Sequence, residues 1–173
     1  ECQNGLRHDR RKKRIDIMLR SLKYIGYTVA CQEVPNEISL IIDISGCPHH
    51  CGGCHSPQLW EYEGRYIKDD LQSLIDKYPS MLTCVCFMGG DQNMSELNDL
   101  LKLTIENGLK TCVYSGCDDY TIFDLSLLDY LKIGHFDISL GGLDNKTTNQ
   151  RFYKVESNSL KDITCVFQQK KSI

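Results

Sequence analysis

The chain has 173 residues, a length that suits one compact domain with its own core. Its 20 basic and 23 acidic side chains give a net charge of −3, which argues against non-specific nucleic-acid binding as the main role. A hydrophobic content of 41% excludes a disordered or fibrous chain. We find no secretory signal and no apolar run of about 20 residues, so we expect a soluble, cytoplasmic protein that binds neither nucleic acid nor membrane.

Residues 1–17 differ from the rest of the chain. Six of the eight residues from 7 to 14 are basic, and no apolar periodicity accompanies them. Such a block indicates a solvated tail or a non-native extension, and less readily an arm that binds nucleic acid. We therefore expect a basic, flexible or non-native extension over residues 1–17 and a single domain over residues 18–173.

Apolar, β-prone runs alternate with helical patterns along the remaining chain. We expect strands over residues 38–44, 82–88, 109–115 and 129–133, followed by a late short strand over 163–167. We expect helices over residues 68–78 and between Asn93 and Gly108, and the segment 120–128 is compatible with a third. Strands that alternate with helices predict right-handed βαβ units and a mostly parallel α/β sheet.

Ligands of such sheets bind beyond the carboxyl ends of the strands. Four distinctive segments fall at predicted strand ends, namely residues 47–54, 89–91, 114–116 and 132–136. Because these ends share one edge of a parallel sheet, we expect the four segments to converge there.

The chain contains ten cysteines, a density typical of either a disulfide framework or metal ligation. Disulfide-rich scaffolds are usually short secreted chains with weak cores, which this sequence does not resemble. Four of the cysteines lie in apolar, β-prone runs and are interpreted as small buried hydrophobes. These four are Cys84, Cys86, Cys112 and Cys165.

Cys47, Cys51 and Cys54 form a C-x3-C-x2-C run directly after the first predicted core strand. Three thiolates this close on a glycine-containing loop can wrap one metal centre, and iron–sulfur clusters are held by cysteine thiolates. With no obvious fourth cysteine, one iron of a 4Fe–4S cluster would stay open to a ligand. A zinc site is the alternative, and its fourth ligand would be His49, His50 or His55.

This cysteine run after the first strand of a βα series resembles the signature of the radical S-adenosylmethionine (radical SAM) enzymes. The resemblance implies that the three cysteines bind a 4Fe–4S cluster whose open iron chelates S-adenosyl-L-methionine. One-electron reduction then cleaves the sulfonium to methionine and a 5′-deoxyadenosyl radical. A full (β/α) barrel needs about 250 residues, so the implied fold is an incomplete barrel with a mostly parallel open sheet and outer helices.

The resemblance also implies roles for residues at the other strand ends. The glycines Gly89 and Gly90 let the backbone approach a ligand, and the carboxylate of Asp91 would bind the methionine amino group. Tyr114 and Ser115 would face the nucleoside, with a simple turn as the alternative. Members of this superfamily usually carry an aromatic residue just before the third cysteine. Here that position is Gly53, and His55 or Trp60 would supply the missing contact with the cluster or the adenine.

Within the superfamily, the small size resembles that of the glycyl-radical activases, and in particular those of anaerobic ribonucleoside-triphosphate reductases. The similarity lies in the blocks ISGCPHHCGGCHSPQLW, FMGGD, VYSG, KIGHF and TTNQRFY. Asn149, Gln150 and Arg151 resemble the Ser-Asn-Gln-Arg element of that group and would shape the cofactor or partner site, unless they form a plain surface loop.

The implied activity is removal of a hydrogen atom from a glycine of the reductase, with a flavodoxin- or ferredoxin-type electron donor. Two alternatives remain open from the sequence. The chain could activate another glycyl-radical enzyme, such as pyruvate formate-lyase, or it could be a non-enzymatic zinc-binding interaction module.

Overall fold

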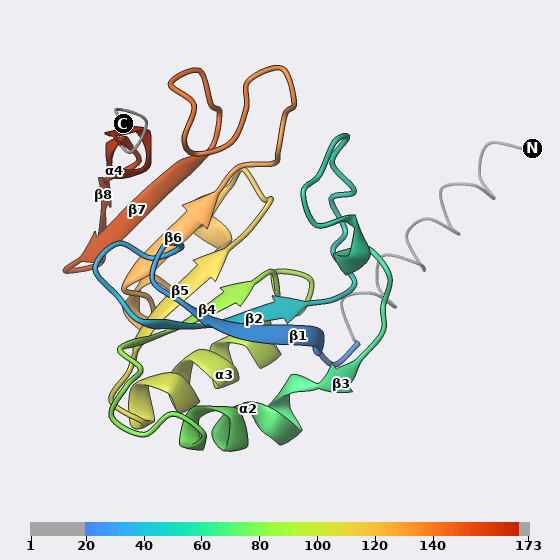
Figure 1. The fold of residues 1–173 in the computed structure, drawn as a ribbon, viewed down its shortest axis with the longest axis vertical. Coiled ribbons are helices and arrows are strands. Elements are labelled where there is room, and N and C mark those ends of the chain that lie inside the picture. Colours follow the sequence, from blue (N-terminus) through green and yellow to red (C-terminus); the bar gives the residue numbers. More distant parts are fainter. Residues whose placement is uncertain (1–19, 170–173) are drawn as a thin grey trace, which may run out of the picture.

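In a computed structural model, residues 20–169 form one eight-stranded sheet with its two longest helices on the same face (Figure 1). The predicted extension over residues 1–17 lies outside the described residues. The strands are β1 (Lys23–Ala30), β2 (Ser39–Ile44), β3 (Arg65–Tyr66), β4 (Cys84–Met88), β5 (Lys110–Tyr114), β6 (Tyr130–Ile133), β7 (Arg151–Glu156) and β8 (Ser159–Asp162). The helices are α2 (Ile67–Asp76), α3 (Met94–Glu106) and α4 (Cys165–Gln168), with 3-10 helices η1 (Pro57–Leu59), η2 (Tyr120–Ile122) and η3 (Leu125–Leu127). No helix of this described part is long and apolar enough to cross a membrane.

The sheet has the strand order β3-β1-β2-β4-β5-β6-β7-β8. Its centre is parallel, because β2 pairs with β4, β4 with β5, and β5 with β6 in the same direction. Both flanks are antiparallel, with β3 and β1 on one side and β7 and β8 on the other. The four predicted central strands and both main predicted helices are confirmed. The sheet as a whole is open and mixed, which corrects the expectation of a mostly parallel one.

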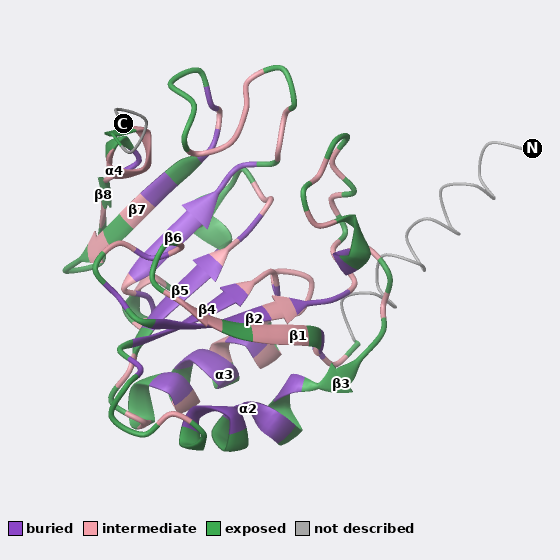
Figure 2. Ribbon diagram, in the orientation of Figure 1, coloured by how far each residue is buried: buried purple, intermediate pink, exposed green. Residues whose placement is uncertain are grey.

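Helices α2 and α3 cover one face of the parallel strands. The strand side chains alternate in direction, so every second residue faces these helices and is buried (Figure 2). The core on this side is drawn from Leu40, Ile42, Ile44, Leu71, Leu74, Val85, Phe87, Leu97, Leu101, Val113 and Leu131. Asn93 caps α3 as expected, since the backbone N–H of Glu96 donates to Asn93 Oδ1 at 3.2 Å.

The opposite face of the sheet carries a second, smaller core. It consists of Val34, Ile41, Cys84, Cys86, Cys112, Tyr130 and Phe152. Phe152 on β7 is fully buried, and its ring contacts those of Tyr114, Tyr130 and Phe167. Three of the four cysteines interpreted as buried hydrophobes are confirmed here, whereas Cys165 is exposed on α4.

The C-terminal region departs most from the sequence expectation. The predicted strand over residues 163–167 is wrong, because the antiparallel strands β7 and β8 precede it and the segment itself turns into α4. Phe152 holds this segment against β7, since its N–H donates to Thr164 Oγ1 and its carbonyl accepts from the N–H of Ile163. Phe167 then packs on the Phe152 ring, and Ile163 and Phe167 are partly buried against the second core, although no residue of α4 is fully buried. The segment 120–128 forms the two short 3-10 helices η2 and η3.

Candidate functional site

The four segments expected at one sheet edge do converge there. The turn after β4 meets the end of β5, where the N–H of Gly89 donates to the carbonyl of Tyr114 at 2.8 Å. The ends of β5 and β6 are joined in the same way by the N–H of Ser115 and the carbonyl of Lys132 at 2.8 Å. The cysteine loop reaches this edge through His49, which lies against Gly116.

The loop with the three cysteines is tied closed at its base. The N–H groups of Gly46 and Cys47 donate to the carbonyls of Glu61 and Leu59, at 3.0 and 2.8 Å. Inside the loop, the N–H of Cys54 donates to the carbonyl of Cys51 at 3.1 Å and forms a tight turn. Pro48 fixes one φ angle of this loop, and Gly53, with a φ of +74°, adopts the left-handed conformation in the tight turn between Cys51 and Cys54.

The donor set of this loop is three thiols, the ligand type that holds 4Fe–4S clusters. Cys47, Cys51 and Cys54 are partly exposed free thiols, and no disulfide occurs among the cysteines of residues 20–169. Within those residues no group of three His, Cys, Asp or Glu is already placed to hold a metal ion. A zinc ion would take its fourth ligand from one of three histidines, and each of these already has a contact in the structure. His49 binds Asp91, His50 stacks on Trp60, and His55 contacts Phe136.

Gly53 has a structural reason to lack a side chain. Its φ of +74° lies in the left-handed region, and an added Cβ would lie 2.8 Å from Cδ1 of Ile138. Ile138, on the loop between β6 and β7, therefore occupies the space beside the third cysteine. His55 packs on Phe136 of the same loop with ring centroids 4.8 Å apart, so this loop contacts the cysteine loop twice.

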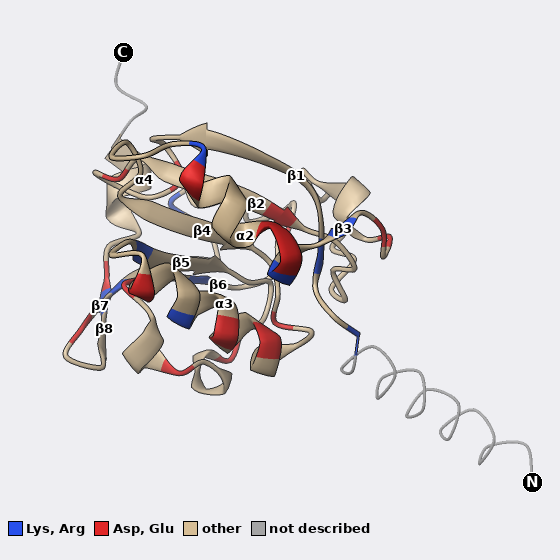
Figure 3. Cartoon of the chain, turned by 90° about the horizontal axis from the view of Figure 1, so that it is seen from below, with Lys and Arg blue, Asp and Glu red and all other residues tan. Residues whose placement is uncertain are grey.

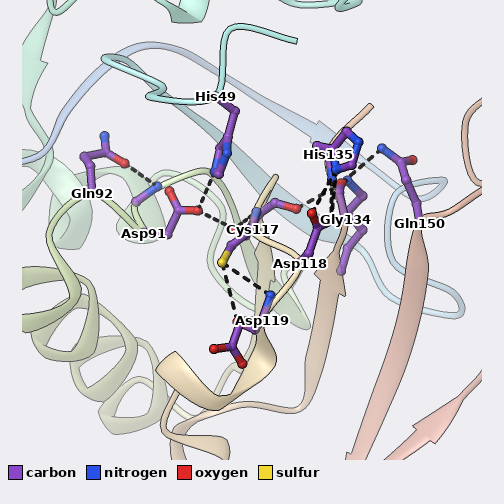
Figure 4. A network of polar contacts seen from close by, with 12 residues as sticks. His49, Asp91, Gln92, Cys117, Asp118, Asp119, Gly134, His135 and Gln150 are labelled. Atoms are coloured by element: carbon purple, nitrogen blue, oxygen red, sulfur yellow. Dashed lines mark hydrogen bonds and ion pairs between the residues drawn. The ribbon is translucent and has the colours of Figure 1, made fainter. Parts of the chain in front are cut away.

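Asp91 lies at the centre of a polar network at the sheet edge (Figure 4). Its Oδ2 atom is 3.0 Å from His49 Nε2 and also accepts from the hydroxyl of Ser115, which in turn accepts from the N–H of Cys117. Burial alone would raise the pKa of Asp91, but the hydrogen bonds from His49 and Ser115 outweigh it and hold that pKa below its usual range. The bond to Asp91 raises the pKa of His49 in turn. Asp91 is thus an ionised carboxylate at a buried position.

Lys132 is a functional candidate that sequence reasoning missed. It lies within strand β6 with only 7% of its surface exposed, and its Nζ atom donates to the carbonyls of Gly134 at 2.6 Å and Ser115 at 3.3 Å. Burial lowers its pKa to about 8, although the nearby Cys51, Asp118, Cys54 and Asp91 oppose the shift. The available signal was a lysine inside the apolar run YLKI, at the start of the segment 132–136 that was expected at the sheet edge.

Of the other residues predicted from the sequence, some lie at the sheet edge and one does not. The Tyr114 hydroxyl donates to the carbonyl of Glu33, so its polar end is engaged in the second core rather than at the edge. Asn149 and Gln150 do lie at the edge, where their side-chain amides donate to the carbonyls of His135 at 2.9 Å and Gly134 at 3.4 Å.

Arg151 contributes less to the edge. Its guanidinium donates to the carbonyls of Thr148 and Gln150, both at 2.8 Å, and its Nε atom lies 3.6 Å from Asp162 on β8. The arginine therefore braces its own turn and the β7–β8 hairpin.

A comparison with protein-family models agrees with this geometry. The model described as a 4Fe-4S single cluster domain matches residues 38–160, well over half of the chain. The match begins just before β2 and includes the cysteine loop and all four strand ends of the site. Searches of curated proteins and of solved structures found no match.

Proposed function

Because the chain belongs to the family of 4Fe-4S single cluster domains, we propose that it is a radical SAM activase whose cluster is held by Cys47, Cys51 and Cys54. The observation that carries the proposal is the closed loop that presents three free thiols beside Asp91 and Lys132. When bound, the cluster supplies one electron, which cleaves the sulfonium of S-adenosylmethionine to methionine and a 5′-deoxyadenosyl radical.

The charges at the sheet edge match the amino-acid part of this cofactor. The carboxylate of Asp91 suits the methionine ammonium, and the ammonium of Lys132 supplies the opposite charge for the methionine carboxylate. Gly89 and Gly90, with φ values of +110° and +109°, keep the backbone free of side chains where the cofactor would approach. Ser115 holds Asp91 in place through its hydroxyl.

The proposed substrate is a glycine on a loop of a larger enzyme, and we favour an anaerobic ribonucleoside-triphosphate reductase. The proposed architecture is the incomplete barrel of the radical SAM type, of which β2, β4, β5 and β6 would form the parallel part. An open sheet edge suits a bulky protein substrate. The similarity of residues 149–151 to the Asn-Gln-Arg element of the reductase activases supports this target.

The experiment uses anaerobically purified protein, reconstituted with iron and sulfide. We expect the absorption and paramagnetic resonance spectra of a reduced 4Fe–4S cluster, and 5′-deoxyadenosine when S-adenosylmethionine and dithionite are added. Air-exposed protein should form none. Adding the reductase should produce a glycyl radical on it, whereas a signal only on pyruvate formate-lyase would reassign the target. Protein that binds zinc instead and forms no 5′-deoxyadenosine would contradict the proposal.

A further inference from the structure

Strand β2 carries one charged side chain, Asp43, to which the proposed function gives no role (Figure 3). Asp43 is half-buried, and in the described part of the chain its carboxylate forms neither a hydrogen bond nor an ion pair. Burial alone shifts its pKa, upward from the usual value. A carboxylate that is drawn partly out of water without a partner costs free energy, so a partner outside this chain would stabilise it.

Asp43 belongs to a row of residues that crosses the sheet from strand to strand. The strand registers pair it with Gly26 on β1 and with Met88 on β4. From Met88 the row continues through Tyr114 on β5 to Lys132 on β6. Side chains that are paired across neighbouring strands point to the same face of a sheet. For this row it is the face with the smaller core, because α2 and α3 cover the other one (Figure 1).

This row has a negative charge at Asp43 and a positive charge at Lys132. Three strand spacings separate the two residues, a distance of about 14 Å that is too long for an ion pair between them. The two side chains in between offer no free polar group. The hydroxyl of Tyr114 already donates to the carbonyl of Glu33, and Met88 has only a thioether. The row is therefore an apolar floor between two charges that do not neutralise each other.

The sheet leaves room for a partner beside the carboxylate of Asp43. Its neighbour Gly26 has no side chain, and a Cβ added there would lie 3.4 Å from Asp43 Oδ2. Thr28, the next residue of β1 on the same face, is exposed. At the other side of the sheet, by contrast, Phe152 is fully buried next to Lys132. Asp43 therefore lies on the more open part of this face, four residues before Cys47 in the chain.

We propose that Asp43 binds a lysine or arginine side chain of the polypeptide segment that carries the target glycine. The inference rests on the proposed function, which has the cofactor at the Asp91 and Lys132 end of the row. A segment whose glycine reaches the cofactor there would continue across the apolar floor toward Asp43. Each residue of an extended chain advances about 3.3 Å, so the cation would lie within about four residues of the glycine. The ion pair would give the carboxylate the partner that it lacks in the free protein.

The test is a double-mutant cycle between the two proteins. The reconstituted protein, with S-adenosylmethionine but no reductant, is titrated with the glycyl-radical enzyme that it activates. Asp43→Asn should raise the dissociation constant roughly tenfold or more, because the cation of the target then lacks a charged acceptor. Replacing that lysine or arginine of the target by methionine should weaken binding to the wild type equally, and add little to the effect of Asp43→Asn. Asp69→Asn is the matched control, because Asp69 is an exposed carboxylate on α2, across the sheet from the row.

Unchanged affinity in Asp43→Asn would overturn the proposal, and so would effects that simply add for every lysine and arginine of the target near its glycine. A second measurement concerns the free protein. Asp43→Asn should keep the wild-type iron content and a free energy of unfolding no lower than that of the wild type, because the carboxylate has no partner there. A lower value of either would show that Asp43 serves the fold and not the target. Failure of the proposed function would show separately, as a lack of 5′-deoxyadenosine from the dithionite-reduced wild-type protein.

Discussion

His49 Nε2 and Asp91 Oδ2 lie 3.0 Å apart and connect the cysteine loop to the turn after β4. The side chain of Asp91 is only 6% exposed, so a cofactor ammonium that binds it must share the carboxylate with His49 or displace it. Movement of the cofactor and of the loop proposed to hold the cluster would then be coupled through one hydrogen bond.

Asp91→Asn should weaken the binding of S-adenosylmethionine without changing the iron content. The substitution keeps the size of the side chain but removes the charge that pairs with the ammonium. A hydrogen bond to a charged group contributes about 1.5–3 kcal/mol, so we expect the affinity to fall roughly ten- to hundred-fold in a titration. Asp118→Asn is the control, because Asp118 forms a similar pair with His135 at 2.9 Å, but an exposed one. Unchanged binding of S-adenosylmethionine in Asp91→Asn would show that the Gly-Gly-Asp segment is only a turn and does not bind the cofactor.

Cys47→Ala, Cys51→Ala and Cys54→Ala should each abolish cluster binding, measured as iron and sulfide content after reconstitution. Cys84→Ala and Cys112→Ala should retain the cluster and lose only stability. Cys84 and Cys112 are fully buried in the second core, so their thiols are shielded from iron at the loop. Full iron content in the Cys51 variant would refute the ligand assignment.

Gly53→Ala should destabilise the loop, and Gly52→Ala should not. Gly53 has a φ of +74° and Ile138 beside it, whereas nothing lies within 4 Å of a Cβ at Gly52. A non-glycine residue in the left-handed region costs about 1–2 kcal/mol, which chemical denaturation would detect as a lower free energy of unfolding. Equal stability of the two variants would show that the backbone at Gly53 relaxes without cost.

Lys132→Met should change how stability depends on pH in the iron-free protein. The pKa of Lys132 is about 8 in the folded protein and about 10.4 when unfolded, so between these values the unfolded chain binds more protons. The free energy of unfolding of the wild type should therefore rise with pH relative to the variant, by about 3 kcal/mol at most. If the free energies of unfolding of the wild type and the variant change equally from pH 8 to 10.5, Lys132 is more hydrated than its burial indicates.

The parallel centre of the sheet was predictable because each of its strands is mostly apolar and buried, as parallel strands usually are. The flanking strands were not. In β1 and in the β7–β8 hairpin, exposed and partly buried residues outnumber buried ones, which leaves a weak pattern. The segment 163–167 misled because five apolar or small residues fit a strand or a helical turn equally well. The contacts that accompany the helical turn come from Phe152 on β7, which lies outside the segment.

For the site, the sequence predicted which segments meet but not which atoms meet. The cysteine spacing and the strand ends are local features that a single sequence displays. The bond between His49 and Asp91 and the contact of Gly53 with Ile138 join residues far apart in the chain, so no local pattern encodes them. The charge of Lys132 was visible in the sequence, but its burial depends on the strands around it.

The burial of Phe152 against Cys84, Cys86 and Cys112 bears on how the protein matures. Before the chain folds, all ten cysteines are equally open to iron and to oxidation. Once β7 is paired, three of them are shielded, and the closed loop offers its three thiols together. Iron delivered too early would meet competing ligands on the same chain. Correct loading therefore favours a sequence of events in which the sheet is complete before iron and sulfide arrive.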